Sequence, residues 1–369
     1  MIIKIAIITV LAVILHPIII FIWKLGLYTQ FNKHYPGRCE RVKGIGVGSE
    51  DFHVFRDGLT FITSGFRLRE HDHEAMLKFV ETNNVTGNIY LYDFNKQNGQ
   101  AQKLSIEESD DFKLASFAPH GISGWDDETT GKRYLFVVNH DLSAGETIDK
   151  FLYLTDKQSL KHIYRYQDNT TMLKLNDVQA TGVNTFYFTN FAPGPNKLLA
   201  LMQYLGQFRW TTVVYYDGAV FRDVLTKMPI SNGIYMSHDQ SHVYIASNLD
   251  SSIMNYKREK NNELTLQQVY ELNAIPDNIL IDHSTGDLYV GTHPIGYRIL
   301  NHLTYPSERA PSMVLQLKTK DHIITDTIEL FYDHGDLITG SSVAYVYKNK
   351  LLVGSIMDTL VHCDINGPQ

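Results

Sequence analysis

The sequence contains little cysteine and little proline, and it has no strong excess of charge of either sign. Only 2 of its 369 residues are cysteine and 11 are proline, which excludes a multi-disulfide scaffold and a proline-rich disordered chain. The formal net charge is −7 and no basic run exceeds a few residues, so nucleic acid is not an expected partner. Hydrophobic residues make up 44% of the chain and aromatic residues 12%. Because aromatic rings pack well on pleated sheets, this composition favours a large β-rich core.

The first segment of the chain is its longest apolar run. Residues 5–23 carry no formal charge at neutral pH and lie between two lysines. As a helix the run would be about 28 Å long, close to the hydrocarbon thickness of a bilayer. Because no small-residue cleavage site precedes Tyr28, we expect an uncleaved signal anchor, with a buried core element as the alternative. The expected division of the chain is an anchor at 1–27, a linker at 28–38 and one globular domain at 39–369.

Two kinds of signal disagree about the orientation of this anchor. Lysine and arginine are more numerous after the apolar run than before it, which favours a cytosolic domain. Glycosylation sequons at Asn84 and Asn169, together with the two cysteines, favour the lumen or the cell exterior. Long domains are translocated with little regard to flanking charge. We therefore expect a single-pass protein of the plasma membrane or endoplasmic reticulum with a lumenal or extracellular domain.

Short apolar runs rich in Tyr, Val, Ile and Phe fill the chain after Gly44, separated by Gly, Asn and Asp turns. Examples are NIYLYDF at 88–94, RYLFVVN at 133–139, HVYIAS at 242–247 and DLYVGT at 287–292. Such runs are typical of β-strands, and apart from residues 196–208 few stretches keep a helical period. The sequence therefore predicts an all-β fold.

A longer repeat is superimposed on these strands, because six polar clusters each lead into an apolar strand at intervals of 45 to 70 residues. The clusters are Glu50-Asp51-Phe52, His120-Gly121-Ile122, Asn176-Asp177-Val178, Asn232-Gly233-Ile234, Asp277-Asn278-Ile279 and Gly340-Ser341-Ser342-Val343. Six repeats of a four-stranded sheet predict a six-bladed β-propeller, in which the innermost strands start around one axis. The alternative for any single cluster is an ordinary turn before a strand.

The side chains in these clusters predict a metal. Carboxylates come from Glu50, Asp51, Asp177 and Asp277, and amide oxygens come from Asn176, Asn232 and Asn278. Oxygen ligands of mixed charge suit Ca²⁺, whereas Zn²⁺ prefers cysteine or histidine at short spacing. Adjacent residues of a strand point to opposite sides, so the paired residues can serve two calcium ions along the axis.

The motifs around the clusters also carry a family resemblance. They include VKGIGVGSEDF at 42–52, SFAPHGIS at 116–123, VVNHD at 137–141, LNDV at 175–178, STGDLYVGTHPIG at 284–296 and GSSVAYVYKNKLLVGS at 340–355. These stretches resemble the serum paraoxonase family of calcium-dependent lactonases and arylesterases, from about Cys39 to Cys363. The resemblance implies a six-bladed propeller with two axial calcium ions, one catalytic and one structural.

The resemblance also assigns metal ligands and a disulfide. It implies that the catalytic calcium is held by Glu50, Asn176, Asn232, Asp277 and Asn278. The structural calcium is expected at Asp51, Asp177 and the backbone oxygen of Ile122. Cys39 and Cys363 are expected to form the disulfide that closes the ring, with two unpaired thiols as the alternative.

By the same resemblance His120 is the base that activates water, and His140 orients it or relays the proton. Glu50 or Asp277 is an alternative proton acceptor, and a turn residue is the ordinary role for a histidine before a strand. His293 and Ile230 are expected to line the pocket. At Phe191-Ala192, where the family often has an acidic residue and a histidine, the sequence departs from the pattern, so the pocket can be reshaped or inactive.

Residues 196–208 place Leu198, Leu201, Met202, Leu205 and Phe208 at helical spacing. By default this stripe packs on the propeller, and the alternative is a helix that faces the membrane. In the family a helix near this position covers the active-site mouth and associates with lipid. Lipophilic esters or lactones would then be the substrates.

Two functions follow from the sequence. The first is a membrane-anchored, calcium-dependent hydrolase of lactones and aryl esters. The second is a catalytically reduced paraoxonase-like membrane protein that assists the folding or assembly of membrane proteins such as ion channels. A sugar-lactone-type propeller with one divalent metal is disfavoured by the doubled acidic pairs and the two histidines.

Overall fold

The computed structural model describes residues 30–67, 73–96, 99–194 and 196–365, together with scattered positions between Lys4 and Gly26. Most of the expected anchor at residues 5–23 lies outside this part of the chain. Within the described part, no helix is both long and apolar enough to cross a bilayer. The signal anchor therefore stays a prediction.

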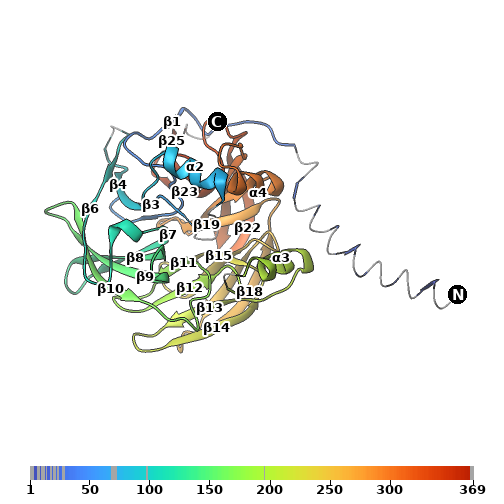
Figure 1. Cartoon of the computed structure of the whole chain (residues 1–369), viewed down its shortest axis with the longest axis horizontal. Helices are drawn as coiled ribbons and strands as arrows, with labels where there is room; N and C mark the ends of the chain where they lie inside the picture. The colour runs from blue at the N-terminus through green and yellow to red at the C-terminus, as the bar shows by residue number, and fades with distance from the viewer. Residues whose placement is uncertain are drawn as a thin grey trace.

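The strands form six antiparallel sheets, and the first strand of each contacts the first strand of a neighbouring sheet, which arranges the sheets as blades of a propeller (Figure 1). The first blade contains β2 (Phe52–Val54), β3 (Leu59–Ser64), β4 (Asn88–Asp93) and β5 (Ala101–Lys103). The second contains β7 (Pro119–Asp127), β8 (Lys132–Asp141), β9 (Gly145–Leu154) and β10 (Ser159–Tyr166), with β6 (Ser105–Glu107) added in parallel. The third contains β11 (Leu175–Ala180), β12 (Phe186–Asn190), β13 (Thr211–Tyr216) and β14 (Phe221–Met228).

The last three blades complete the ring. The fourth contains β15 (Ser231–Met236), β16 (His242–Ser247), β17 (Ser252–Arg258) and β18 (Leu264–Glu271). The fifth contains β19 (Ile275–Ile281), β20 (Leu288–His293), β21 (Ser312–Lys320) and β22 (Ile323–Asp333). The sixth contains β23 (Ser341–Tyr347), β24 (Lys350–Ser355), β25 (Val361–Asp364) and β1 (Cys39–Arg41). Each of the six polar clusters starts, or directly precedes, the first strand of one blade. The predicted six-bladed propeller is therefore confirmed.

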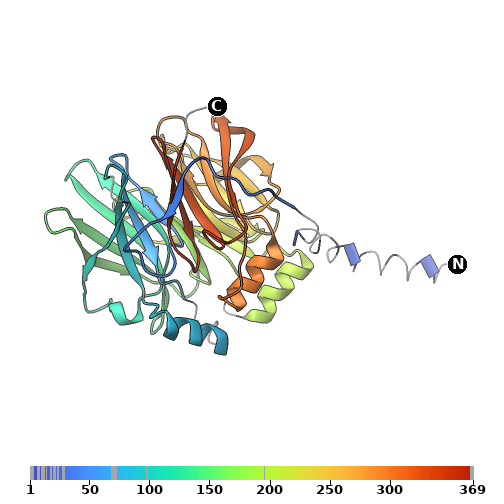
Figure 2. The same ribbon diagram turned by 90° about the horizontal axis from the view of Figure 1, so that it is seen from above.

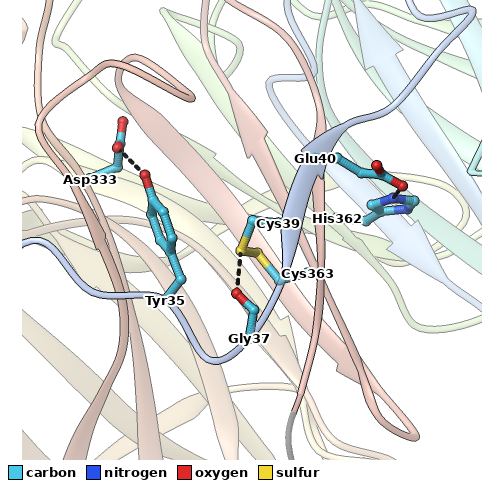
Figure 3. The surroundings of a disulfide bond; sticks show 7 residues. All are labelled: Tyr35, Gly37, Cys39, Glu40, Asp333, His362 and Cys363. Atoms are coloured by element: carbon cyan, nitrogen blue, oxygen red, sulfur yellow. Dashed lines mark hydrogen bonds and ion pairs between the residues drawn. A yellow bond between two sulfur atoms is a disulfide. The ribbon is translucent and has the colours of Figure 1, made fainter.

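The ends of the chain are joined in the last blade. Strand β1 pairs with β25 so that Cys39 lies opposite Cys363, and the two cysteines form a disulfide (Figure 3). The residues predicted as a linker continue along β22, where Phe31 stacks on Tyr332 with ring centroids 5.0 Å apart and the Tyr35 hydroxyl donates to Asp333. The segment before β1 is therefore fixed to the fifth blade, which contains β22.

Removal of the disulfide should destabilise the propeller. The cysteines are separated by 324 positions, and a cross-link over so long a loop restricts the unfolded chain strongly. We expect the Cys39→Ser/Cys363→Ser variant to lose about 2 to 5 kcal/mol in its free energy of unfolding, measured by denaturant titration. Reduction of the wild-type protein should give the same shift. An unchanged unfolding midpoint in both samples would contradict the prediction.

Three helices that flank the blades lie on one side of the propeller (Figure 2). They are α2 (Glu74–Thr82), α3 (Lys197–Gly206) and α4 (Gly296–Thr304). Helix α3 begins where the Asn196 side chain accepts hydrogen bonds from two backbone N–H groups, and it ends where Gln207 adopts a left-handed conformation. Of these helices only α3 was expected from the sequence, because its segment places apolar residues at helical spacing.

The apolar stripe of α3 does not pack on the blades, so the default expectation is wrong. Its five apolar side chains are between 39% and 63% exposed; they are Leu198, Leu201, Met202, Leu205 and Phe208. The opposite side of the helix contacts the protein instead, where Gln203 is buried and Tyr204 lines a cavity. This side of α3 points inward because it borders the cavity and not the hydrophobic core.

The two sequons lie on the surface of the domain. Asn84 follows α2 and Asn169 lies in the turn between β10 and β11, and both are exposed. Their exposure is compatible with glycosylation, which stays a prediction.

Candidate functional site

The inner strands change register at the predicted ligands. Pairing with the second strand of the blade shifts between Pro119 and Ile122 in β7, between Leu175 and Val178 in β11, between Ser231 and Ile234 in β15, and between Pro276 and Ile279 in β19. Such irregularities leave residues unpaired and re-aim their side chains. Because of this bulge, consecutive polar residues of one cluster can both direct their side chains toward the propeller axis.

Two glycines allow neighbouring inner strands to approach each other closely. A Cβ atom at Gly121 would lie 2.7 Å from the Asn176 carbonyl oxygen, and one at Gly233 would lie 2.7 Å from the Asp277 carbonyl oxygen. No side chain fits at these distances. The glycines therefore bring the polar clusters of adjacent blades together at the axis.

The predicted ligands of the catalytic calcium fit a cation. Four buried oxygens of this set have no hydrogen-bond partner; they are Glu50 Oε2, Asn176 Oδ1, Asn232 Oδ1 and Asn278 Oδ1. The amide of Asn278 donates to Glu50 Oε1 at 3.1 Å, which leaves its own oxygen free. Unpaired buried oxygens are costly, and a hard cation is the partner that satisfies several at once. Among the described residues no group of three or more His, Cys, Asp or Glu could hold a metal, and three of the four unpaired oxygens belong to asparagines.

The charges at the axis also call for a cation. Burial and the neighbouring Asp277 carboxylate raise the pKa of Glu50 well above its ordinary value. Burial raises the pKa of Asp51 and of Asp177 in the same way, and in Asp51 the charge of Asp177 adds to the effect. A positive charge placed among buried carboxylates that repel one another stabilises them as anions.

The predicted structural set connects blades through the backbone. Asp51 Oδ2 accepts the Ile122 N–H at 2.8 Å, and Asp177 Oδ2 accepts the Ile234 N–H at 2.8 Å. The other oxygen of each carboxylate accepts the N–H of the next residue in its own strand. Each of these aspartates therefore bridges one inner strand to the next, and the oxygens keep lone pairs for a metal.

The predicted catalytic residues meet in a cavity of about 270 Å³ below the helices. Its polar residues include Glu50, His120, His140, Asn176, Asn232, Asp277 and His293. The remaining wall is mainly apolar and includes Phe66, Phe191, Ile299, Leu300 and Leu303. Leu25, Tyr204 and Gln207 also line it, so the residues before the propeller and helix α3 contribute to its walls. Sites of this kind, apolar with a few convergent polar groups, are typical of small-molecule binding.

His120 and His140 form a direct pair. His120 Nδ1 lies 2.9 Å from His140 Nε2, and His120 Nε2 lies 3.3 Å from Glu50 Oε1. The ring of Phe66 covers His120 at a centroid distance of 4.4 Å. Burial lowers the pKa of His120 to about 4 and also lowers the pKa of His140. Both imidazoles are therefore neutral at physiological pH, the form that accepts a proton.

The two predicted wall residues have different positions. His293 lines the cavity, and its Nε2 contacts Asp277 Oδ2 at 2.9 Å. Ile230 does not line it, which corrects the sequence prediction. It lies at the turn into β15 with a φ of 51°, and its side chain is fully buried in the protein. Asn248 and Leu249, which follow β16, contribute to the wall.

Two charged residues of the site were missed in the sequence. Glu146 contacts His140 Nδ1 at 2.9 Å, and Lys174 Nζ lies 3.6 Å from Glu146. Glu146 is the cross-strand partner of His140 in the hairpin of β8 and β9. The short polar stretch between VVNH and the next apolar run is the signal of this hairpin, and its register would have indicated Glu146. No comparable signal in the sequence indicates Lys174.

The fold and the cavity define a six-bladed β-propeller with an oxygen-rich axial site under a helical cover. The sequence matches the family described as Arylesterase over residues 30–365. It is 36% identical over 333 residues to serum paraoxonase/arylesterase 1 of Homo sapiens, covering 89% of this chain and 88% of that protein. It is 30% identical over 338 residues to serum paraoxonase/lactonase 3 of Oryctolagus cuniculus, covering 92% of each. The chain therefore belongs to the paraoxonase/arylesterase family, and the resemblance seen in its motifs is confirmed.

Solved structures support the fold. A luciferin-regenerating enzyme superposes with a TM-score of 0.53 at 11% identity, covering 90% of this chain and 96% of that chain. Regucalcin from Agrobacterium tumefaciens, a calcium-binding protein, superposes with a TM-score of 0.50 at 10% identity, covering 91% and 96%. At these identities the likeness shows the propeller fold alone.

Proposed function

We propose that the protein is a calcium-dependent hydrolase of lactones and aryl esters that works in the axial cavity. The observation that carries the proposal is the set of four unpaired buried oxygens next to a neutral histidine pair. The family generally binds calcium, and its relatives are named for arylesterase and lactonase activities. A calcium ion held by Glu50, Asn176, Asn232, Asp277 and Asn278 would polarise the substrate carbonyl and stabilise the oxyanion.

The chain's own residues provide the remaining chemistry. His120 lies in the cavity as a neutral base beside Glu50, so it is placed to take a proton from water. His140 contacts the other ring nitrogen of His120 and orients it. His293 holds Asp277 in place through its hydrogen bond to Oδ2. Phe66 packs on His120 and limits its access to bulk water.

The substrate is expected to be lipophilic. Apolar side chains from α4 and from the segments that follow β3, β12, β16 and β24 form much of the cavity wall, and only a few polar groups reach into it. Such a wall binds an alkyl or aryl group through burial of apolar area and leaves the carbonyl near the polar floor. Long-chain lactones and hydrophobic aryl esters match this division.

The exposed stripe of α3 is proposed to contact a bilayer. Its apolar side chains are exposed, Phe208 stacks on Trp210 with centroids 4.5 Å apart, and the inner side of the helix lines the cavity. Membrane contact at this helix would place the cavity mouth at the lipid surface, where lipophilic substrates concentrate. The anchor expected at residues 1–27 would hold the same side toward the membrane.

Membrane contact predicts slow amide exchange in α3. In lipid nanodiscs, exchange of α3 in the full chain should be slower than in detergent, because fully buried leucines contribute about 1.5 to 3 kcal/mol each. Leu201→Asp/Leu205→Asp should remove this protection. The matched control is Leu266→Asp, which changes a leucine that is 48% exposed on the outer strand β18. Equal exchange in α3 with and without lipid would contradict the contact.

The hydrolase proposal is tested by turnover. Purified calcium-loaded protein should hydrolyse an aryl ester and a medium-chain lactone, and chelation should stop the reaction. Two bound calcium ions per chain are expected by elemental analysis. Activity that survives complete removal of calcium would refute the mechanism.

The second candidate is a non-hydrolytic paraoxonase-like membrane protein that assists the assembly of other membrane proteins. It is favoured by Phe191, which places an apolar ring in the cavity wall where the family often has an acidic residue. Calcium-loaded protein without turnover on a broad ester and lactone panel, but with a membrane protein that co-purifies, would support it. The disulfide is consistent with a secretory-pathway location for either function.

A further inference from the structure

Glu146, the second residue of β9, is held at the histidine pair by contacts from β8 and from the start of β11. Its two carboxylate oxygens lie 3.0 and 2.9 Å from His140 Nδ1, across the hairpin of β8 and β9. Oxygen Oε2 also accepts the N–H of Leu175, the first residue of β11, at 3.0 Å. Lys174 Nζ lies 3.6 Å from Oε1. The side chain of Glu146 is only 18% exposed, so these contacts fix the carboxylate in one orientation.

The charge state of Glu146 determines the direction of the hydrogen bonds. Burial alone would raise its pKa, but His140, Lys174 and the Leu175 N–H lower it to about 2. An ionised carboxylate can only accept, so His140 Nδ1 carries the proton and donates it to Glu146. His140 Nε2 then has a free lone pair and accepts from His120 Nδ1 at 2.9 Å. The atom left to accept a further proton is His120 Nε2, beside Glu50.

We propose that Glu146 is a positioning residue that completes a carboxylate–imidazole–imidazole relay with His140 and His120. When water attacks the substrate carbonyl, its proton moves to His120 Nε2 and the proton on His120 Nδ1 moves to His140 Nε2. The new C–O bond uses an electron pair of the water oxygen, the π pair of the carbonyl moves to the carbonyl oxygen, and the positive charge is held by His140 beside Glu146. The acyl C–O bond then breaks, the protons return by the same route, and the leaving oxygen is protonated. This inference rests on the proposed hydrolase function.

The relay explains why Glu146 lies beside the buried His140 and why Lys174 lies beside Glu146. His140 is buried, and burial disfavours an imidazolium ion unless an anion is in contact with it. Glu146 supplies that anion at hydrogen-bond distance, while Lys174 keeps the carboxylate ionised when His140 is neutral. The same logic operates in hydrolases where a buried carboxylate orients a histidine and stabilises its charged form.

Kinetics of a Glu146→Gln variant test the relay. The variant keeps the size of the side chain and removes the charge, so kcat should fall about 100-fold or more while KM changes little. Glu146→Asp keeps the charge and should recover part of kcat. The control is Glu40→Gln, which removes the carboxylate from a similar contact, 3.1 Å from His362, outside the cavity lining. It should leave both constants unchanged.

Imidazole ¹⁵N NMR gives a readout that does not depend on turnover. In the wild-type full chain at neutral pH, His140 should be the neutral Nδ1–H form, and in Glu146→Gln the Nε2–H form should appear. An Nε2–H form in the wild type, or a kcat of Glu146→Gln within twofold of wild type, would overturn the relay. If the wild-type protein hydrolyses no substrate, the proposed function fails, and the NMR result still decides whether Glu146 sets the tautomer.

Discussion

Removal of calcium is expected to abolish hydrolysis and to lower the melting temperature of the protein by about 5 to 10 °C, because a ligand present at 1,000 times its Kd stabilises by about 4 kcal/mol. The physical reason is the arrangement of carboxylates at the axis. Glu50, Asp51, Asp177 and Asp277 are all buried close together, so without a cation their negative charges disfavour the folded state. The measurement is differential scanning calorimetry with an ester assay, before and after chelation.

The effect of calcium should also depend on pH. In the metal-free protein the pKa values of Glu50, Asp51 and Asp177 are raised above those of the unfolded chain. The folded metal-free state then binds more protons than the unfolded state, so its stability falls as the pH rises above about 4, the ordinary value for a carboxyl group. Calcium replaces those protons, and the difference in melting temperature between loaded and metal-free protein should be larger at pH 8 than at pH 6.

Controls separate calcium from general ionic effects. Addition of calcium to the chelated protein should restore both stability and activity, whereas magnesium should not, because Mg²⁺ needs shorter bonds and a stricter octahedral geometry. Chelated protein that retains its melting temperature and activity, with no metal by elemental analysis, would remove calcium from the account of this site.

Replacement of His120 should have the second large effect. We expect His120→Ala to lower kcat about 100- to 10,000-fold, since this is the usual contribution of a positioned general base. Calcium content should not change, because His120 contacts Glu50 but is not among the predicted ligands. The assay is steady-state hydrolysis of an aryl ester, with metal content measured on the same sample.

The control for this variant is His362→Ala. His362 contacts Glu40 near the closing disulfide (Figure 3). It also contacts the Tyr92 hydroxyl, and it does not line the cavity. Its replacement should leave kcat unchanged. If His120→Ala kept its activity while chelation abolished turnover, Glu50 or Asp277 would become the candidate base.

Much of the candidate site could be predicted because the propeller repeats a local rule. Each blade begins with an inner strand, so the polar residues before six apolar runs had to meet at one axis once the blade number was known. Glu50, Asn176, Asn232 and Asp277 were found in this way, and they line one cavity. The sequence prediction for Ile230 was wrong because its positive φ, which directs the side chain into the core and not toward the cavity, could not be read from the sequence.

The amino-acid sequence by itself predicted the β-class and the number of blades, because these depend on composition and on spacing along the chain, and its resemblance to the paraoxonase family implied the pairing of Cys39 with Cys363 and the axial oxygen ligands. Only the tertiary structure decided which side of α3 is exposed, that Lys174 reaches Glu146, and that four oxygens at the axis have no partner. Those properties depend on contacts between different blades. Residues far apart in the sequence make these contacts only when the ring of blades closes, and no local sequence pattern predicts how close they come.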